Sequence, residues 1–364
     1  MNAINSRAAK PPILPLRPFA PAPLPLVLPI QVHPEVREAL HNRQPIVALE
    51  TAVATAGLPA APLGRAPACD APGWNMDAHC GAEALALMQR RVRAGGAVPA
   101  TVGVLDGTLR IGMDGPDLAR LVVSGASIKA SARDLAVVMA TGGTAGTTVS
   151  ATLVACRHPL VGIRVMATGG IGGVHRKWTD RLDISADLGA LATSTVCVVA
   201  SGVKSVLDVA ATLEALEALG VPVLAFGTPL MPLFFSRGRE TLPAPRRVDD
   251  IATVVETCRV NWEVLQSSTS VLLANPIAER HAIDAAEVDR ILAEFDDPAV
   301  AGARTPLLLA EVQQRTGNRA LDANIALLAD NASLAARVAT ELMTDVVPPA
   351  ALRSLTQPAT GDGR

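Results

Sequence analysis

The feature that most constrains the fold is an alternation of short apolar runs with segments of helical spacing. The apolar runs are VGIRVMA (161–167), TVCVVAS (195–201), VPVLAFG (221–227) and SVLLANP (270–276). Helical spacing lies between them, in KSVLDVAATLEALEALG (204–220) and DDIATVVETCRVNWEVLQ (249–266). Strands that alternate with helices form a largely parallel sheet covered on both faces. The chain is therefore predicted to be a three-layer α/β/α protein with a largely parallel central sheet.

The first half of the chain adds further elements to this sheet. Residues 33–42 predict a helix that starts at Pro34, and IVALETAV (46–53) predicts a strand. Residues 81–96 predict a helix that ends in glycine, and PATVGVLDGTLRIGM (99–113) predicts a hairpin that turns at Asp106-Gly107. Two more helices are expected at 114–125 and 131–143, and the segment from 285 to 343 is predicted to be helical.

One catalytic α/β/α domain is expected to span residues 32–350. Residues 1–31 contain a proline every few positions and predict an extended tail. Residues 60–80 are rich in Pro, Gly and Ala without any period, which predicts a loop insertion within the domain. Residues 351–364 are expected to form a flexible C-terminal tail.

Composition excludes several classes of partner. The 32 basic and 34 acidic residues give a net charge of -2, and only 2% of the residues are aromatic, so polymeric nucleic acid is not an expected ligand. No stretch reaches the roughly 18 apolar residues that a membrane helix needs. The five cysteines are scattered and odd in number, which is typical of reduced thiols and predicts a cytoplasmic location.

Polar residues and glycines follow several of the predicted strands. Glu50 ends IVALE, four glycines follow VGIRVMAT, Lys204 follows VCVVASGV, and Asn275 ends VLLAN. Ligands of α/β sheets bind beyond the carboxyl ends of the strands. We therefore expect these features to converge on one rim of the sheet and to form a binding site there.

The glycine-rich stretch ATGGIGGVHR (167–176) is not a dinucleotide fingerprint. The pattern G-x-G-x-x-G would place its last glycine at His175, and no Gly-Lys-Ser/Thr follows that would indicate a phosphate-binding P-loop. Two interpretations remain: a close passage of the backbone through a tight turn, or a run of N–H groups that faces an anion. In the second case His175 and Arg176 are candidate anion ligands.

Lys204 lies at the opening of the helix predicted over 204–220, where a positive charge is unfavourable. It either extends to solvent or is a nucleophile whose pKa is lowered by burial and by a neighbouring cation such as Lys129. Glu50 is expected to be partly desolvated, which would raise its pKa and suit it to proton transfer near neutral pH. A glutamate in an exposed turn would give the same pattern.

RLDISADL (181–188) places Asp183 and Asp187 four residues apart, with Ser185 between them. Charges and hydroxyls at the start of a helix explain such clusters, and so does a hard divalent cation held by one carboxylate and several waters beside a phosphate. Together these features indicate a site for carbonyl or sugar chemistry, and the residues alone do not specify it further.

Eight motifs occur in the order and approximate spacing of one enzyme family. They are ALETAVATAGLP, GAVPATVGVLDG, KASARDL, GTTVSAT, ATGGIGGVHR, DISADL, SGVKSVLD and ANPIAE, and they run from about residue 32 to about residue 342. In these motifs the chain resembles the pseudouridine-5'-phosphate glycosidases, a group that includes indigoidine synthase A-like proteins. The resemblance implies a cytoplasmic homotrimer that cleaves pseudouridine 5'-phosphate reversibly to uracil and ribose 5-phosphate, with one Mn²⁺ per subunit.

The resemblance also implies a role for individual residues. Glu50 in ALET matches the general acid/base, and Lys204 in SGVKS matches the nucleophile that forms an imine with C1' of the ribose. Asp183 matches the metal ligand, and Asn275 matches a contact to the uracil ring. The further substrate-binding positions are Lys129, Thr148, Val149, Ser185, Ala186 and Asp187.

Four departures from the family pattern leave alternatives open. Thr51 and Ala56 stand where the family usually has a serine and a histidine. The usual G-A-E-x-T is KWTDR (177–181) here, and about 18 residues are added after Pro59. A related enzyme with another base or sugar phosphate as substrate therefore remains an alternative, as does a non-catalytic sugar-phosphate-binding protein. The presence of Glu50 and Lys204 favours an enzyme.

Overall fold

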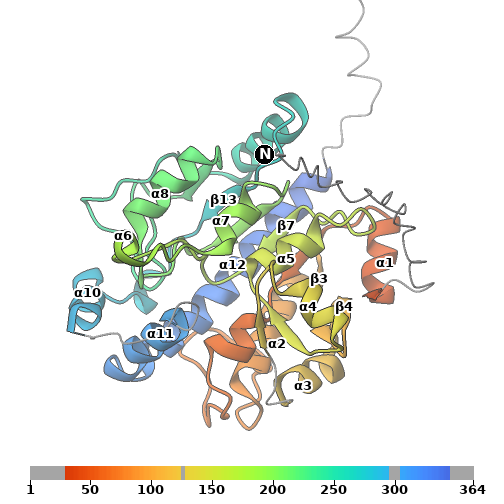
Figure 1. Ribbon diagram of the computed structural model, residues 1–364, viewed down its shortest axis with the longest axis horizontal. Coiled ribbons are helices and arrows are strands. Elements are labelled where there is room, and N and C mark those ends of the chain that lie inside the picture. The colour runs from red at the N-terminus through yellow and green to blue at the C-terminus, as the bar shows by residue number, and fades with distance from the viewer. Residues whose placement is uncertain (1–28, 124–127, 295–303, 345–364) are drawn as a thin grey trace, which may run out of the picture.

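The computed structural model describes residues 29–123, 128–294 and 304–344 (Figure 1). In this part of the chain the main sheet has 11 strands, and its order is β1-β4-β3-β2-β7-β9-β13-β11-β12, with β6 paired to β3 and β5. The strands are β1 Ile30–Val32, β2 Ile46–Leu49, β3 Val98–Leu105, β4 Thr108–Ile111, β5 Ile128–Ala130, β6 Ala145–Thr147, β7 Val165–Ala167, β9 Cys197–Ala200, β11 Val223–Phe226, β12 Arg247–Val248 and β13 Val271–Ala274. A separate antiparallel pair joins β8 Val174–His175 to β10 Leu207–Asp208.

The strands from β3 through β2, β7, β9, β13 and β11 to β12 are all parallel, as the alternating pattern predicts. Helices cover both faces: α2, α9 and α12 pack together on one, and α5 and α7 pack together on the other (Figure 1). The α/β/α prediction is confirmed. The α-helices are α1 Pro34–His41, α2 Cys80–Ala94, α3 Gly115–Val123, α4 Leu135–Ala140, α5 Val149–Cys156, α6 Trp178–Arg181, α7 Ala186–Leu191, α8 Val209–Ala218, α9 Ile251–Arg259, α10 Ala285–Glu294, α11 Arg304–Arg315 and α12 Asn318–Thr344.

The hairpin of β3 and β4 is confirmed at the predicted turn. The strands pair antiparallel, and Leu105 faces Thr108 across the two-residue loop. Asp106 has a φ of 47° and Gly107 a φ of 73°. Two successive residues with positive φ are what the twist of a tight hairpin requires, and Asp-Gly tolerates them better than most pairs.

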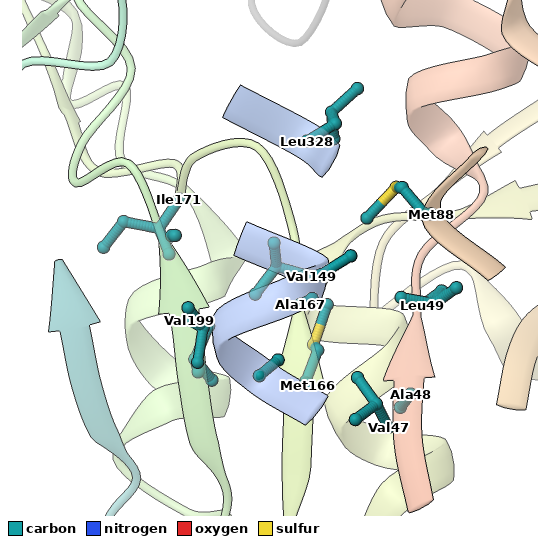
Figure 2. Close-up of a cluster of buried hydrophobic side chains, with 14 of the residues drawn as sticks. Val47, Ala48, Leu49, Met88, Val149, Met166, Ala167, Ile171, Val199 and Leu328 are labelled. Atoms are coloured by element: carbon teal, nitrogen blue, oxygen red, sulfur yellow. The ribbon is translucent and has the colours of Figure 1, made fainter. Parts of the chain in front are cut away.

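Helix α12 forms the centre of the core. It packs against β2, β7 and β9 of the sheet and against α2, its neighbour in the same helical layer. Figure 2 shows Leu328 of α12 and Met88 of α2 beside apolar side chains of the central strands, such as Leu49, Met166 and Val199. All of these side chains are essentially inaccessible to solvent, so the carboxyl ends of the strands are held by a close-packed core.

Several boundaries differ from the predictions. The strand predicted over 46–53 ends at Leu49, and the helix predicted over 131–143 covers only Leu135–Ala140. Residues 1–28 and 345–364 lie outside the described residues, but the predicted tail over 1–31 ends too late, because Ile30–Val32 form β1 beside β4. The helix predicted from Lys204 begins at Val209, where the Asp208 carboxylate accepts a hydrogen bond from the Ala211 N–H at 3.0 Å. Lys204 therefore lies in the loop after β9, and the unfavourable helix position inferred for it does not exist.

The segment predicted as a loop insertion contains no helix or strand over residues 60–79, all of which the structure describes. It is nevertheless fixed to the domain. The Arg65 guanidinium donates two hydrogen bonds to the Asp322 carboxylate near the start of α12, at 3.0 and 2.9 Å.

Within the described residues, no helix combines the length and the apolar character that crossing a membrane would require.

Candidate active site

A cavity of about 480 Å³ opens at the carboxyl ends of the parallel strands. Its wall combines acidic, basic and hydroxyl side chains with the backbone of four glycines. The lining residues are Glu50, Ala52, Val53, Ala56, Gly57, Lys129, Ser131, Arg133, Asp134, Thr148, Ser150, Gly169, Gly170, Gly172, His175, Leu182, Asp183, Ile184, Ser185, Ala186, Asp187, Lys204, Phe234, Leu309 and Asn324. Glu50, the glycine-rich loop and Lys204 of the predicted rim therefore line one cavity.

Glu50 lies directly after β2 and is only 5% exposed. Burial raises the pKa of its carboxyl group, and the positive charge of Lys204 and a hydrogen bond from the Thr168 hydroxyl oppose this effect without cancelling it. Asp187 raises the pKa further and Lys129 lowers it. A carboxyl group in this environment retains its proton to a higher pH than an exposed glutamate and can act as a proton donor.

Two lysines face this carboxyl group. Lys204 follows β9, and its backbone N–H donates a hydrogen bond to the Ile171 carbonyl in the glycine-rich loop at 3.1 Å. Lys129 lies in β5, where burial and the positive charge of Lys204 lower the pKa of its ammonium group. Asp187 and Glu50 oppose that decrease. The site thus combines two amines and two carboxyl groups in a desolvated space, which suits both nucleophilic attack and proton transfer.

The glycine-rich loop is a close passage of the backbone. A Cβ atom at Gly172 would lie 2.3 Å from the Ser185 Oγ, and one at Gly170 would lie 2.6 Å from the Phe234 ring. The first interpretation of the stretch is confirmed. The Gly172 N–H also faces an anion, but that anion belongs to the protein: it donates to Asp187 at 2.8 Å, and the Ser150 N–H donates to the same carboxylate at 2.9 Å.

Asp183 and His175 lie together on the cavity wall. The Asp183 Oδ2 is 3.8 Å from the His175 Nδ1, and both side chains are largely buried. In the described part of the chain, no group of three His, Cys, Asp or Glu side chains could hold a metal ion without other ligands. One largely buried carboxylate on the wall of a cavity fits a divalent cation that takes its other ligands from a bound molecule and water. The donor set is therefore compatible with the predicted cation.

The structure separates three candidates from this group. Asn275 follows β13 but is not among the described residues that line the cavity; its amide instead donates to the Asn331 Oδ1 at 3.0 Å. Val149 is buried behind Thr148, which does line the cavity. Arg176 binds Asp289 at 2.8 Å and lines a different cavity.

Several lining residues were not anticipated from the sequence. Asn324 reaches the cavity from α12, Ser150 from α5 and Arg133 from the loop before α4. Thr168, which binds Glu50, carries a positional signal, because it directly follows the strand β7. Asn324 carries a weaker one: it is an amide in a helix whose other inward residues are mostly apolar.

Comparison with known proteins yields consistent relatives. Residues 75–341 match the family described as indigoidine synthase A like protein. The chain is 44% identical to the pseudouridine-5'-phosphate glycosidase of Paracoccus denitrificans, over 86% of this chain and 99% of that one. It is 42% identical to the pseudouridine-5'-phosphate glycosidase of Myxococcus xanthus, over 84% and 95% of the two chains.

Two solved structures are similar across most of the chain. One is an indigoidine synthase A-like protein of Thermotoga maritima, with a TM-score of 0.74, 32% identity and coverage of 86% of this chain and 96% of that one. The other is the prealnumycin C-glycosynthase AlnA in complex with ribulose 5-phosphate, with a TM-score of 0.74, 33% identity and coverage of 86% and 97%.

Proposed function

The chain belongs to the indigoidine synthase A-like family, and from this premise we propose that it is a pseudouridine-5'-phosphate glycosidase. The enzyme cleaves the bond between C1' of the ribose and C5 of uracil, reversibly, in nucleoside salvage. The observation that carries the proposal is that Glu50, with its raised pKa, and Lys204 face one cavity. A protonated carboxyl group and an amine are the two groups that this reaction needs.

An ordinary glycosidase protonates a departing oxygen, but here the leaving atom is carbon. The Lys204 nitrogen bonds to C1' while the bond from C1' to the ring oxygen breaks, and that oxygen takes a proton. Glu50 donates the proton that C5 of uracil gains. The bond between C1' and C5 then breaks, its electron pair restores the C5–C6 double bond, and the lysine nitrogen forms an iminium with C1'. Water hydrolyses the iminium and releases ribose 5-phosphate.

The other site residues bind the substrate in this proposal. Lys129, Thr148, Ser185, Ala186 and Asp187 line the cavity and surround the sugar phosphate, with Val149 behind Thr148. Asp187 is already fixed by the N–H groups of Ser150 and Gly172, which supports a positioning role. Asp183 would hold one Mn²⁺ ion, which would supply positive charge for binding the phosphate.

Two measurements test the proposal. Uracil release from pseudouridine 5'-phosphate, followed by ultraviolet absorbance with and without Mn²⁺, tests the substrate and the metal. Incubation with ribose 5-phosphate and borohydride, followed by mass spectrometry, tests the imine, and a Lys204→Arg variant is the matched control. Absence of an adduct on Lys204 would contradict the imine mechanism.

A second candidate is a related C-glycoside enzyme with a different base or aromatic acceptor. The similarity to a C-glycosynthase in complex with ribulose 5-phosphate favours it, since that protein is as similar in fold as the Thermotoga protein. Part of the cavity wall is also apolar, with Ala52, Val53, Ala56 and Leu309. Condensation of ribose 5-phosphate with a panel of aromatic acceptors, measured against uracil, distinguishes the two candidates.

The homotrimer and the cytoplasmic location also belong to this proposal. The family resemblance supports the trimer, which light scattering after gel filtration would test. All five cysteines are free thiols, which supports a reducing compartment.

A further inference from the structure

A polar residue directly follows each of four adjacent parallel strands. Glu50 follows β2, Thr168 follows β7, Ser201 follows β9 and Asn275 follows β13. Backbone hydrogen bonds continue beyond the strands: the Thr168 N–H donates to Val199, and the Asn275 N–H donates to Ala200. The four residues therefore form a row across the carboxyl ends of the sheet, and Glu50, the member that lines the cavity, stands at one end.

Asn331 of α12 binds three members of this row. Its side-chain amide donates to the Thr168 carbonyl at 2.8 Å and to the Ser201 hydroxyl at 3.1 Å. Its Oδ1 accepts a hydrogen bond from the Asn275 amide at 3.0 Å. Asn331 is completely buried and is not among the described residues that line the cavity, so it does not touch substrate. A buried amide that satisfies both of its ends fixes the groups around it.

We propose that Asn331 is a positioning residue for the acid/base: it fixes the turn at Thr168, whose hydroxyl orients and polarises the Glu50 carboxyl group. Asn275 does not contact substrate. Its amide donates to the Asn331 Oδ1 and so orients the Asn331 amide with its Nδ2 toward Thr168. The inference rests on the proposed function for its catalytic meaning. Its structural content, a connection from α12 to Glu50, does not depend on the identity of the substrate.

The groups around Glu50 determine how the loss of Thr168 or Asn331 would change the pKa of its carboxyl group. Lys204 and Lys129 lower the pKa of Glu50, Asp187 raises it, and the hydrogen bond from Thr168 lowers it. Loss of the Thr168 hydroxyl therefore moves the Glu50 titration to higher pH. Loss of Asn331 leaves the hydroxyl in place but frees the backbone that carries it, so the shift has the same sign and a smaller size.

The test compares Thr168→Val, Asn331→Leu and the double variant. Titration of Glu50 is followed by infrared difference spectroscopy of its protonated carboxyl band against a Glu50→Gln background, which needs no turnover. We expect Thr168→Val to raise the midpoint by about one pH unit, since a hydrogen bond to a charged group is worth about that much. Asn331→Leu should raise it by roughly half as much, and the double variant should not exceed Thr168→Val.

Asn261→Leu is the matched control, because Asn261 is another buried amide whose Nδ2 donates to a backbone carbonyl, that of Thr269, at 3.1 Å. It should lose stability without moving the Glu50 midpoint, and Thr168→Ser should restore the wild-type midpoint. If Asn331→Leu does not fold, Asn275→Ala loosens the same amide and should move the midpoint in the same direction.

A Glu50 midpoint in Asn331→Leu equal to that of the wild type, or a double variant whose shift is the sum of the single shifts, overturns the inference. Failure of the wild-type protein to release uracil would instead overturn the proposed function, and the infrared titration would still decide the role of Asn331.

Discussion

Two charged cavities share a wall in this protein, and only one of them has the properties of a reactive site. The second cavity, of about 400 Å³, is lined by Arg176, Arg239 and Asp289 together with Ser205 and Asp208. The pair of β8 and β10 separates it from the first, since His175 lines one cavity while Leu207 and Asp208 line the other. Both cavities are thus lined by basic and acidic side chains.

The difference lies in pairing and burial. Asp289 is bound by both arginines at 2.8 Å, and its side chain is 32% exposed. Burial raises the pKa of Asp289, but the hydrogen bonds from Arg176 and Arg239 outweigh burial and lower it. Glu50 is buried with a single hydroxyl partner, and its pKa is raised. Burial that the hydrogen-bond partners and nearby charges do not offset, and not the presence of charge, therefore distinguishes the reactive cavity.

The largest expected effect comes from the amine of the reactive cavity. Lys204→Arg keeps a positive charge beside Glu50 but removes the nucleophile, so uracil release should fall by about 10⁴-fold or more. Steady-state assays and borohydride trapping measure this loss. A variant that keeps more than a tenth of wild-type activity would show that the charge of Lys204, and not its nitrogen lone pair, is what the site requires.

Glu50→Gln tests the buried carboxyl group of the reactive cavity. The substitution preserves size and hydrogen bonding but removes the transferable proton, so kcat should fall by about 10² to 10⁴-fold. Because burial raises the pKa of Glu50, the protonated acid persists to higher pH than an exposed glutamate, and the pH–rate profile of the wild type should lose a limb in the variant. A profile of unchanged shape would assign that limb to another group.

The sequence shows clearly which residues directly follow a strand, and this position predicts the site. Alternating apolar runs predict the parallel sheet, and residues directly after a strand must lie at its carboxyl end, which places Glu50 and the glycine-rich loop correctly. The rest depends on contacts between distant segments. The apolar spacing continues from Val206 into α8, so it cannot show that Asp208 caps the helix and leaves Lys204 in a loop. Asn324 and Asn331 are two polar residues of a buried helix, and Asn331 binds Thr168 and Ser201, which lie more than a hundred residues away.

Lys129 should have a moderate effect on binding. Lys129→Met removes a charge expected to contact the phosphate, and KM should rise by about 10 to 100-fold, because charge-assisted hydrogen bonds are worth roughly 1.5 to 3 kcal/mol. Its pKa is lowered by burial and by Lys204, so the wild type loses this charge at a lower pH than an exposed lysine would. KM of the wild type should therefore rise in alkaline solution, and Lys129→Arg should delay that rise. Equal pH dependence in both proteins would contradict the role.

Asp289→Asn should have the smallest effect and completes the comparison of the cavities. Both arginines would lose their shared carboxylate, but all three side chains are between 32% and 41% exposed, so the loss of stability should be about 1 kcal/mol or less. The folded-state pKa of Asp289 is lowered, so this stability is present above the unfolded-state pKa, near 3.9, and is lost as the pH falls through the folded-state value. Urea unfolding should therefore separate the variant from the wild type at pH 7, and the difference should shrink as the pH falls below about 4 and through the folded-state pKa. Uracil release should stay within about twofold of the wild type, since surface ion pairs contribute little; a larger loss would mean that the second cavity acts on the first through the loop that carries Lys204.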